Sequence, residues 1–158
     1  MLELGQILGL VGAALAVLMA GIGSAKGVAI AGQANAGVCS ENPNVFGQAL
    51  VLELLPGTQG IYGFLIGFIV LQAMGILGGN GMVAMTVGQG LMMLASCLPI
   101  AIVGLASGIL QGKVAASAIG LLGRRTDMGG KGILMTVMVE TYAILALLAS
   151  FLMVNAVL

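Results

Sequence analysis

Four long apolar segments, separated by three short breaks, constrain the fold of this chain more than any other feature of its sequence. The segments are residues 5–38, 46–76, 83–122 and 130–157. Each is longer than the roughly 20 residues that a helix needs to cross a bilayer. The breaks hold the Asn, Asp, Pro and clustered Gly typical of turns, and they are residues 40–44, 78–81 and 123–130. Since lipid leaves no backbone polar group unpaired and strand-like alternation is absent, we predict an all-α membrane protein of four transmembrane helices.

The composition agrees with lipid as the solvent of this chain. Charged residues make up 6% and apolar residues 60% of the sequence, whereas a soluble domain carries about a quarter charged residues. The net charge is zero and His is absent, which excludes a basic surface for nucleic acid. No glycine-rich loop ending in Gly-Lys-Ser or Gly-Lys-Thr occurs, so we expect no ATP-hydrolysing or other catalytic site in this chain. Cys39 and Cys97 have no metal or redox spacing, and we interpret both as inert.

The cations predict how the chain is oriented. Arg124, Arg125 and Lys131 flank the third break, while the second break and both ends of the chain carry neither Lys nor Arg. Because Lys and Arg accumulate in cytoplasmic loops, we predict a multi-pass membrane protein with the loops at 40–44 and 123–130 in the cytoplasm. Both termini then lie outside.

The sequence repeats itself, which predicts two tandem hairpins, residues 1–79 and 80–158. For the second and fourth segments a shift of 83 residues aligns Gly57 with Glu140. For the first and third segments we align residues at a shift of 87, which places Lys26 against Lys113 and Ser24 against Gln111. The two shifts differ by four residues, a difference that we expect the hairpin loops to absorb. One hairpin therefore keeps a carboxylate that the other has lost.

Glu140 is the main candidate for a functional group. It lies about ten residues past the third break, which is roughly 15 Å deep along a helix. An ionised carboxylate at that depth costs several kcal/mol, so its side chain has to face protein, water or an ion. Reversible binding of a proton or a metal cation is the functional interpretation. The structural alternative is a protonated Glu that hydrogen-bonds between helices.

A second polar cluster follows Pro56 in the second segment. Proline removes a backbone donor and bends a helix, which frees nearby carbonyl groups. Thr58, Gln59 and Tyr62 come next at helical spacing, and hydroxyl, amide and carbonyl oxygens suit hard cations such as Na⁺. Gln111 in the third segment is a further amide. A proline kink satisfied by local hydrogen bonds is the alternative.

Small residues recur every fourth position in the first and third segments. They are Gly12, Ala16, Ala20 and Ser24 in the first, and Gly104, Gly108, Gly112, Ala116 and Gly120 in the third. Such stripes let helices approach closely. We therefore predict that the first and third helices form a crowded inner layer and the bulkier second and fourth an outer one. A closed ring of many copies would use both faces.

Three further charges, Lys26, Lys113 and Glu53, fall inside the segments. All three are expected in the cytoplasmic half, where lysine stems can extend to the interface. We expect them to form interfacial ion pairs, with a role in ion entry as the alternative.

Together these residues carry a family resemblance along essentially the whole chain. The stretches concerned are residues 21–27, 55–63, 111–116 and 139–142. The chain resembles the proteolipid (c or K) subunit of bacterial V-type, or A/V-type, rotary ATPases. The resemblance implies a homo-oligomeric ring in membrane lipid that turns against a stator membrane subunit and bears a central-stalk subunit on its cytoplasmic side. Ring rotation is then coupled to ATP hydrolysis or synthesis in other subunits.

The sodium-translocating branch of that family also implies a ligand set. Its members match here to the Leu55 carbonyl, Thr58, Gln59, Gln111 and Glu140, with Na⁺ as the transported ion and no organic cofactor. Tyr62 matches the residue that hydrogen-bonds the carboxylate and locks the loaded site. Glu53 is a departure, because an uncharged polar residue is expected there.

Three other functions remain open from the sequence. A proton-only ring would need the carboxylate alone. A small glutamate-dependent secondary transporter for organic cations would want aromatic walls, but aromatic residues are only 4% and Trp is absent. A structural or channel-forming oligomer leaves the polar ligand set unexplained. A native gel separates a high-order ring from the dimer expected of a transporter.

Overall fold

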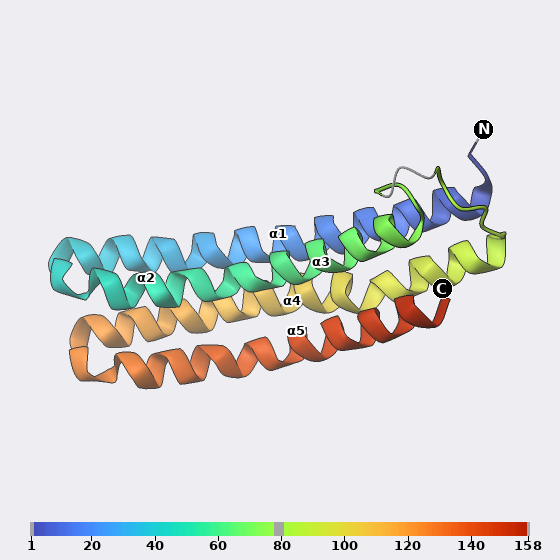
Figure 1. Ribbon diagram of the computed structural model, residues 1–158. Helices are drawn as coiled ribbons and strands as arrows, with labels where there is room; N and C mark the ends of the chain where they lie inside the picture. Colours follow the sequence, from blue (N-terminus) through green and yellow to red (C-terminus); the bar gives the residue numbers. More distant parts are fainter. Residues whose placement is uncertain (1, 78–80, 158) are drawn as a thin grey trace.

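Four long helical rods run side by side in the computed structural model, which describes residues 2–77 and 81–157 (Figure 1). In chain order the elements are α1 (Leu4–Glu41), η1 (Pro43–Val45), α2 (Phe46–Leu54), η2 (Leu55–Gly57), α3 (Thr58–Ala73), α4 (Val87–Arg124), η3 (Thr126–Met128) and α5 (Gly129–Val157). Within the described residues, four helical stretches are long and apolar enough to cross a membrane. The predicted all-α, multi-pass architecture is confirmed. The boundary expected between residues 79 and 80 lies outside the described residues.

The connection between the two halves shortens the predicted helices. The second rod ends at Ala73 rather than 76, and Gly75 adopts φ = 77°, a left-handed conformation that favours glycine. The third rod begins at Val87 rather than 83, because Thr86 caps the helix. Its hydroxyl accepts a hydrogen bond from the Gln89 N–H at 3.3 Å, in a capping box.

Both hairpins are built on the same plan, and this corrects the alignment of the first and third helices. The N-caps are Glu3 and Thr86 and the C-caps are Asn42 and Arg125, so that both pairs are 83 residues apart. The predicted shift of 87 is therefore wrong. A four-residue error is one helical turn, and small residues at every fourth position match at either shift. Gln111 consequently aligns with Val28 instead of Ser24, while Glu140 still aligns with Gly57.

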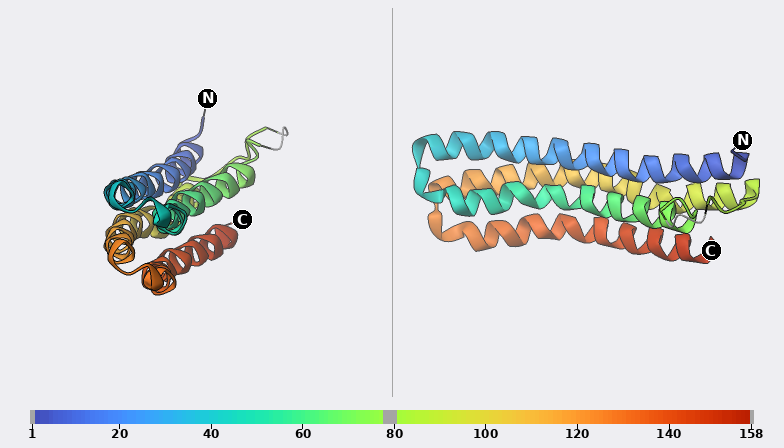
Figure 2. Two further views of the ribbon diagram at one scale, coloured as in Figure 1. Left: turned by 90° about the vertical axis from the view of Figure 1, so that its left-hand side faces the viewer. Right: turned by 45° about the horizontal axis from the view of Figure 1, so that its top comes forward.

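The two layers expected from the small residues are present. Figure 2 shows α1 and α4 stacked in one layer, with α3 and α5 in the other. A Cβ atom placed on Gly104 would lie 2.8 Å from the Ala20 Cβ, and one on Gly108 would lie 2.7 Å from the Gly23 carbonyl carbon. The α1 and α4 backbones are thus in direct contact, which only glycine permits. By contrast, α3 and α5 expose large side chains such as Phe64 and Leu148.

The three intramembrane charges do not pair as expected. Lys26 and Lys113 are exposed, and the Glu53 carboxylate instead accepts a hydrogen bond from the Asn35 Nδ2 at 2.7 Å. In the described part of the chain the only ion pair joins Arg125 to Asp127, at 3.0 Å. The expectation of interfacial ion pairs is wrong, because Glu53 faces α1 while both lysines lie on outward faces.

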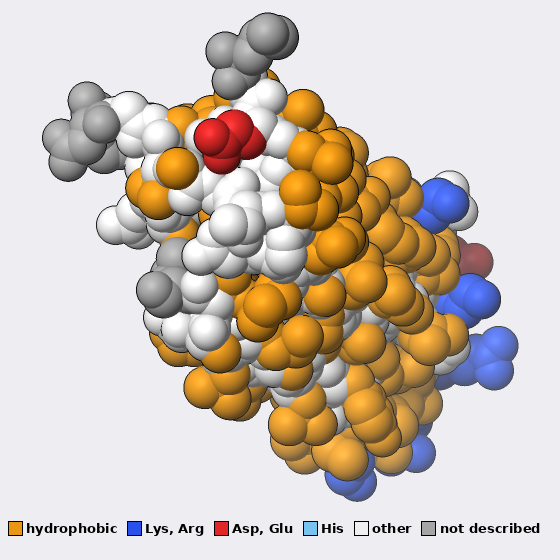
Figure 3. Space-filling model, turned by 90° about the vertical axis from the view of Figure 1, so that its right-hand side faces the viewer, with side chains coloured by type: hydrophobic (Ala, Val, Ile, Leu, Met, Phe, Trp, Pro, Cys, Tyr) orange, Lys and Arg blue, Asp and Glu red, His pale blue; other side chains and the backbone are white. Residues whose placement is uncertain are grey.

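Charge is distributed unevenly between the two ends of the bundle. Both termini lie at one end and both hairpin turns at the other. Figure 3 looks onto the end with the termini, where an acidic side chain is visible, while the Lys and Arg side chains appear only at the edge of the view. Arg124 ends α4, Arg125 follows it and Lys131 lies in the first turn of α5, so these cations lie at the end with the hairpin turns, as the sequence predicts.

Candidate ion-binding site

Glu140 lies within α5 and its side chain is buried, with 8% of the residue exposed. The Tyr62 hydroxyl, from α3, donates a hydrogen bond to Glu140 Oε1 at 2.6 Å. The bond joins the two outer helices across the junction of the hairpins. Among the described residues, no Lys or Arg side chain forms an ion pair with it, and a buried carboxylate is costly unless its charge is balanced.

Two glutamines form a second pair beside this junction. Gln59 of α3 and Gln111 of α4 are both completely buried. The Gln59 Nε2 donates a hydrogen bond to the Gln111 Oε1, and the Gln111 Nε2 donates to the Thr136 carbonyl at 3.2 Å. The Gln59 Oε1 is buried and receives no hydrogen bond from the residues that the structure describes. An unpartnered buried oxygen is costly, and it offers its lone pairs to a cation.

The break at Pro56 supplies a third pair of oxygens. One turn of 3₁₀-helix, η2, separates α2 from α3, as expected where proline removes a backbone donor. The Thr58 hydroxyl donates to the Leu55 carbonyl at 3.0 Å, and the Thr58 N–H bonds the same oxygen. Local hydrogen bonds thus satisfy this kink, as the structural alternative has it. The Leu55 carbonyl accepts two of them, while the Thr58 hydroxyl oxygen keeps its lone pairs free.

The structure therefore assembles the predicted residues as three pairs. They are Tyr62 with Glu140, Gln59 with Gln111, and Thr58 with the Leu55 carbonyl. The residues of the three pairs lie on η2 and α3 in the first hairpin and on α4 and α5 in the second. The candidate site therefore spans both hairpins.

Two supporting residues were missed by the sequence. Ser24 of α1 accepts a hydrogen bond from the Gly60 N–H at 2.7 Å, which attaches α3 to α1 one residue after Gln59. Thr136 presents its carbonyl to Gln111 and lies one helical turn before Glu140. The sequence indicates Ser24 only as a member of the small-residue stripe. The spacing of Thr136 from Glu140 was a usable signal, since residues four apart share a helix face.

The chemistry of the site suits a hard monovalent cation or a proton. Its groups are one carboxylate and several neutral oxygens, which would balance a single positive charge. Over residues 2–77 and 81–157, no cluster of three or more His, Cys, Asp or Glu side chains occurs. The oxygen ligands of the candidate site therefore differ from the His and Cys ligands that transition metals prefer.

Comparison with known proteins places the chain in a family. Residues 11–70 and 94–153 each match the family of ATP synthase C subunits. The chain is 48% identical over 150 residues to the V-type sodium ATPase subunit K of Enterococcus hirae, covering 95% of this chain and 92% of that protein. It is 40% identical over 151 residues to the A-type ATP synthase subunit K of Methanocaldococcus jannaschii, covering 96% of this chain and 63% of that protein. The two matched segments are offset by the same 83 residues as the helix caps. The chain belongs to the family of ATP synthase C subunits and, within it, to the V-type and A-type ATPase subunits K.

Proposed function

We propose that this chain is the rotor-ring subunit of a sodium-translocating V-type ATPase in a bacterial plasma membrane. The observation that carries the proposal is a single buried carboxylate, Glu140, held by Tyr62 beside a buried amide pair. The relative from Enterococcus hirae, a sodium ATPase subunit by name, supports the choice of ion. A stator membrane subunit and a cytoplasmic central stalk complete the machine, and the ATP sites lie in other subunits.

In this proposal each copy carries one Na⁺. Glu140 supplies the balancing charge, and the neutral ligands are Gln59, Gln111, Thr58 and the Leu55 carbonyl. Among these ligands, Gln59 Oε1 has lone pairs available for an ion, because it is buried and accepts no hydrogen bond from the described residues. Tyr62 holds the carboxylate in place and closes the site on the side of α3.

Transport follows from the cost of charge in hydrocarbon. A loaded site is neutral and can pass the lipid as the ring turns, whereas an empty ionised Glu140 costs several kcal/mol there. The empty site is stable only beside water or a cationic group of the stator. Rotation in one direction therefore requires that an ion be released and another be taken up at each passage.

A proton-only ring is the second candidate. A proton needs the carboxylate and its Tyr62 partner only, and would leave the Gln59–Gln111 pair without a role. The buried Gln59 Oε1 favours Na⁺, since a proton on Glu140 gives that oxygen no partner.

Carbodiimide labelling of the purified ring separates the two candidates. Carbodiimides add to the protonated carboxyl group, so bound Na⁺ should slow the labelling of Glu140. The Na⁺ concentration for half-protection should rise as the pH falls, because proton and Na⁺ compete for one oxygen pair. Choline chloride controls for ionic strength, and Glu140→Gln should remove the labelling.

Each contrary result has its own meaning. Labelling of Glu140 that Na⁺ does not slow would overturn the sodium assignment and leave a proton ring. Labelling that persists unchanged in Glu140→Gln would place the functional carboxylate elsewhere.

A further inference from the structure

Ser107 of α4 carries a buried hydroxyl group without a hydrogen-bond partner. Over the described part of the chain, only two buried side-chain nitrogen or oxygen atoms form no hydrogen bond, and they are Gln59 Oε1 and Ser107 Oγ. Ser107 is 5% exposed and lies one helical turn before Gln111, the residue that Gln59 contacts. Buried hydroxyl groups in native proteins are bound to protein or to ordered water. Both unpartnered oxygens therefore point to something that binds close to the amide pair.

The packing of α4 against α5 places Ser107 opposite Glu140. Two hydrogen bonds align these helices, and they join the Ile100 N–H to Ser150 Oγ at 3.1 Å and the Gln111 Nε2 to the Thr136 carbonyl at 3.2 Å. On α4, Ser107 lies seven residues after the first contact and four before the second. The same steps along the antiparallel α5 end at Ala143 and Glu140, which are both buried. Ser107 therefore faces the helical turn from Glu140 to Ala143.

The equivalent serine of the first hairpin shows why Ser107 is left without a partner. Ser24 lies 83 residues earlier and accepts a hydrogen bond from the Gly60 N–H at 2.7 Å. Gly60 is in the first turn of α3, directly after the break at Pro56, where N–H groups are available to outside partners. Its counterpart Ala143 lies in the middle of the unbroken α5, so that its N–H is used within the helix. The methyl group of Ala143 also occupies the place where a Cβ on Gly60 would come within 3.3 Å of the Ser24 Oγ.

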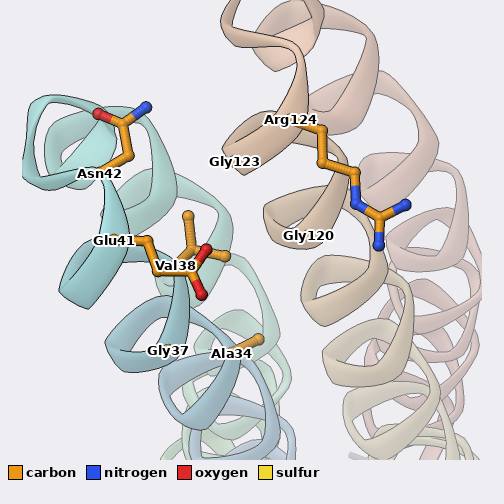
Figure 4. Close-up of a pocket in the computed structure, with 8 residues that line it drawn as sticks. All are labelled: Ala34, Gly37, Val38, Glu41, Asn42, Gly120, Gly123 and Arg124. Atoms are coloured by element: carbon orange, nitrogen blue, oxygen red, sulfur yellow. The ribbon is translucent and has the colours of Figure 1, made fainter.

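Ser107 is remote from the open cavity at the end with the hairpin turns. That cavity has a volume of about 430 Å³ and lies between α1 and α4, and Figure 4 shows Gly120, Gly123 and Arg124 on its α4 side. Gly120 is the nearest of these in sequence, and the 13 residues from Ser107 to Gly120 span about 20 Å of helix. The partner of Ser107 is therefore expected inside the bundle, at the level of Glu140.

We propose that Ser107 is a positioning residue of the cation site, whose hydroxyl group binds the Glu140 carboxylate through one water molecule. Tyr62 donates to Glu140 Oε1, and an ionised carboxylate also accepts hydrogen bonds on its other oxygen. Ser107 Oγ and Glu140 Oε2 give a water molecule the two polar partners that it needs. Held from two sides, the carboxylate keeps one orientation toward the ion. The inference rests on the proposed function only in that Glu140 binds Na⁺.

Substitutions that keep or remove the hydroxyl group test this role in the purified ring. Ser107→Thr and Ser107→Val add the same bulk, and only the first keeps a hydroxyl group. Ser107→Ala and Ser107→Val should raise the Na⁺ concentration that half-protects Glu140 from carbodiimide about fivefold, the usual contribution of one hydrogen bond. Ser107→Thr should stay close to wild type. Ser96→Ala is the matched control, because Ser96 is 1% exposed on the same helix and its hydroxyl donates to the Met92 carbonyl at 2.8 Å.

The outcomes separate this inference from the proposed function. A Ser107→Ala ring that Na⁺ protects as well as wild type, or a Ser107→Thr ring protected as weakly as Ser107→Val, would overturn the role of Ser107 and leave the proposed function standing. Failure of Na⁺ to protect the wild-type ring would instead remove the proposed function. A density map that resolves water then decides the bridge by itself. Water within hydrogen-bond reach of both Ser107 Oγ and Glu140 supports the bridge, and a Ser107 hydroxyl bound elsewhere contradicts it.

Discussion

Glu140 depends on neighbours that come from both hairpins. Its hydrogen-bond donor, Tyr62, lies on α3 in the first hairpin, and the hydrogen bond between Gln59 and Gln111 joins α3 to α4. Neither hairpin alone contains the site. At the scale of single residues, the candidate site therefore consists of a few side chains that only the packed chain brings together.

Removing the Tyr62 hydroxyl should weaken ion binding without preventing it. Tyr62→Phe deletes the 2.6 Å hydrogen bond to Glu140, and hydrogen bonds to charged groups contribute about 1.5 kcal/mol or more, or roughly tenfold in affinity. The measurement is the Na⁺ concentration that half-protects Glu140 from carbodiimide. Tyr142→Phe is the matched control, since Tyr142 is 66% exposed. Equal effects of the two substitutions would contradict the role of Tyr62.

The two intramembrane glutamates should differ sharply in transport. Glu140→Gln removes the charge that balances the ion, so ATP-driven Na⁺ uptake into inverted vesicles should be lost. Glu53→Gln keeps a side chain that can bond Asn35 and should leave uptake close to the wild-type rate. Loss of uptake in Glu53→Gln would instead indicate that this carboxylate takes part in ion entry.

At the scale of elements, the contact between α1 and α4 sets the geometry of the site. Gly27 of α1 fits between Gly108 and the Pro56 ring, and its added Cβ would come within 2.7 Å of the Pro56 Cβ. The glycine thereby fixes how closely the kinked second rod approaches α1 and α4. Helix packing and ion ligands are linked through this one position.

Gly27→Ala should consequently destabilise the protein. The new methyl group collides with backbone and with Pro56, and overpacking of this kind costs about 1–3 kcal/mol. Gly47→Ala is the control, because nothing lies within 4 Å of its added Cβ and alanine is the better helix former. Thermal unfolding of the detergent-solubilised protein measures both. A Gly27→Ala variant as stable as wild type would show that α1 and α4 can separate freely.

Much of the fold follows from the sequence because lipid permits few alternatives. The four rods and their two layers could be predicted from apolar length and small-residue spacing, and the Tyr62–Glu140 contact from the family resemblance. The direct Gln59–Gln111 hydrogen bond was not predicted, because the resemblance gives the two amides only as members of one ligand set. The alignment of the first and third helices could not be predicted correctly. Small residues recur there every fourth position, so shifts of 83 and 87 residues match them equally well. The partner of Glu53 was also missed, because a neutral Asn35 carries no long-range signal of its own.

At the scale of the whole molecule, orientation remains a prediction of the cation distribution. Arg124, Arg125 and Lys131 lie at the end with the hairpin turns, so that end should face the cytoplasm. In a chain with both native cysteines replaced, an impermeant maleimide added to intact cells should label Ala84→Cys, which is exposed near the termini, and should spare Thr126→Cys. The reverse labelling pattern would invert the topology.

The pairing of Gly57 with Glu140 across the repeat has a mechanical consequence. If Glu140 is the ion carrier, as proposed, four helical rods share one carrier. A rotor of given circumference then moves half as many ions per revolution as it would with an acid in every hairpin. For a fixed amount of ATP per revolution, each ion then receives more work. Having Gly57 where the second hairpin has Glu140 should therefore lower the number of ions moved per revolution and allow Na⁺ to be driven against a steeper gradient.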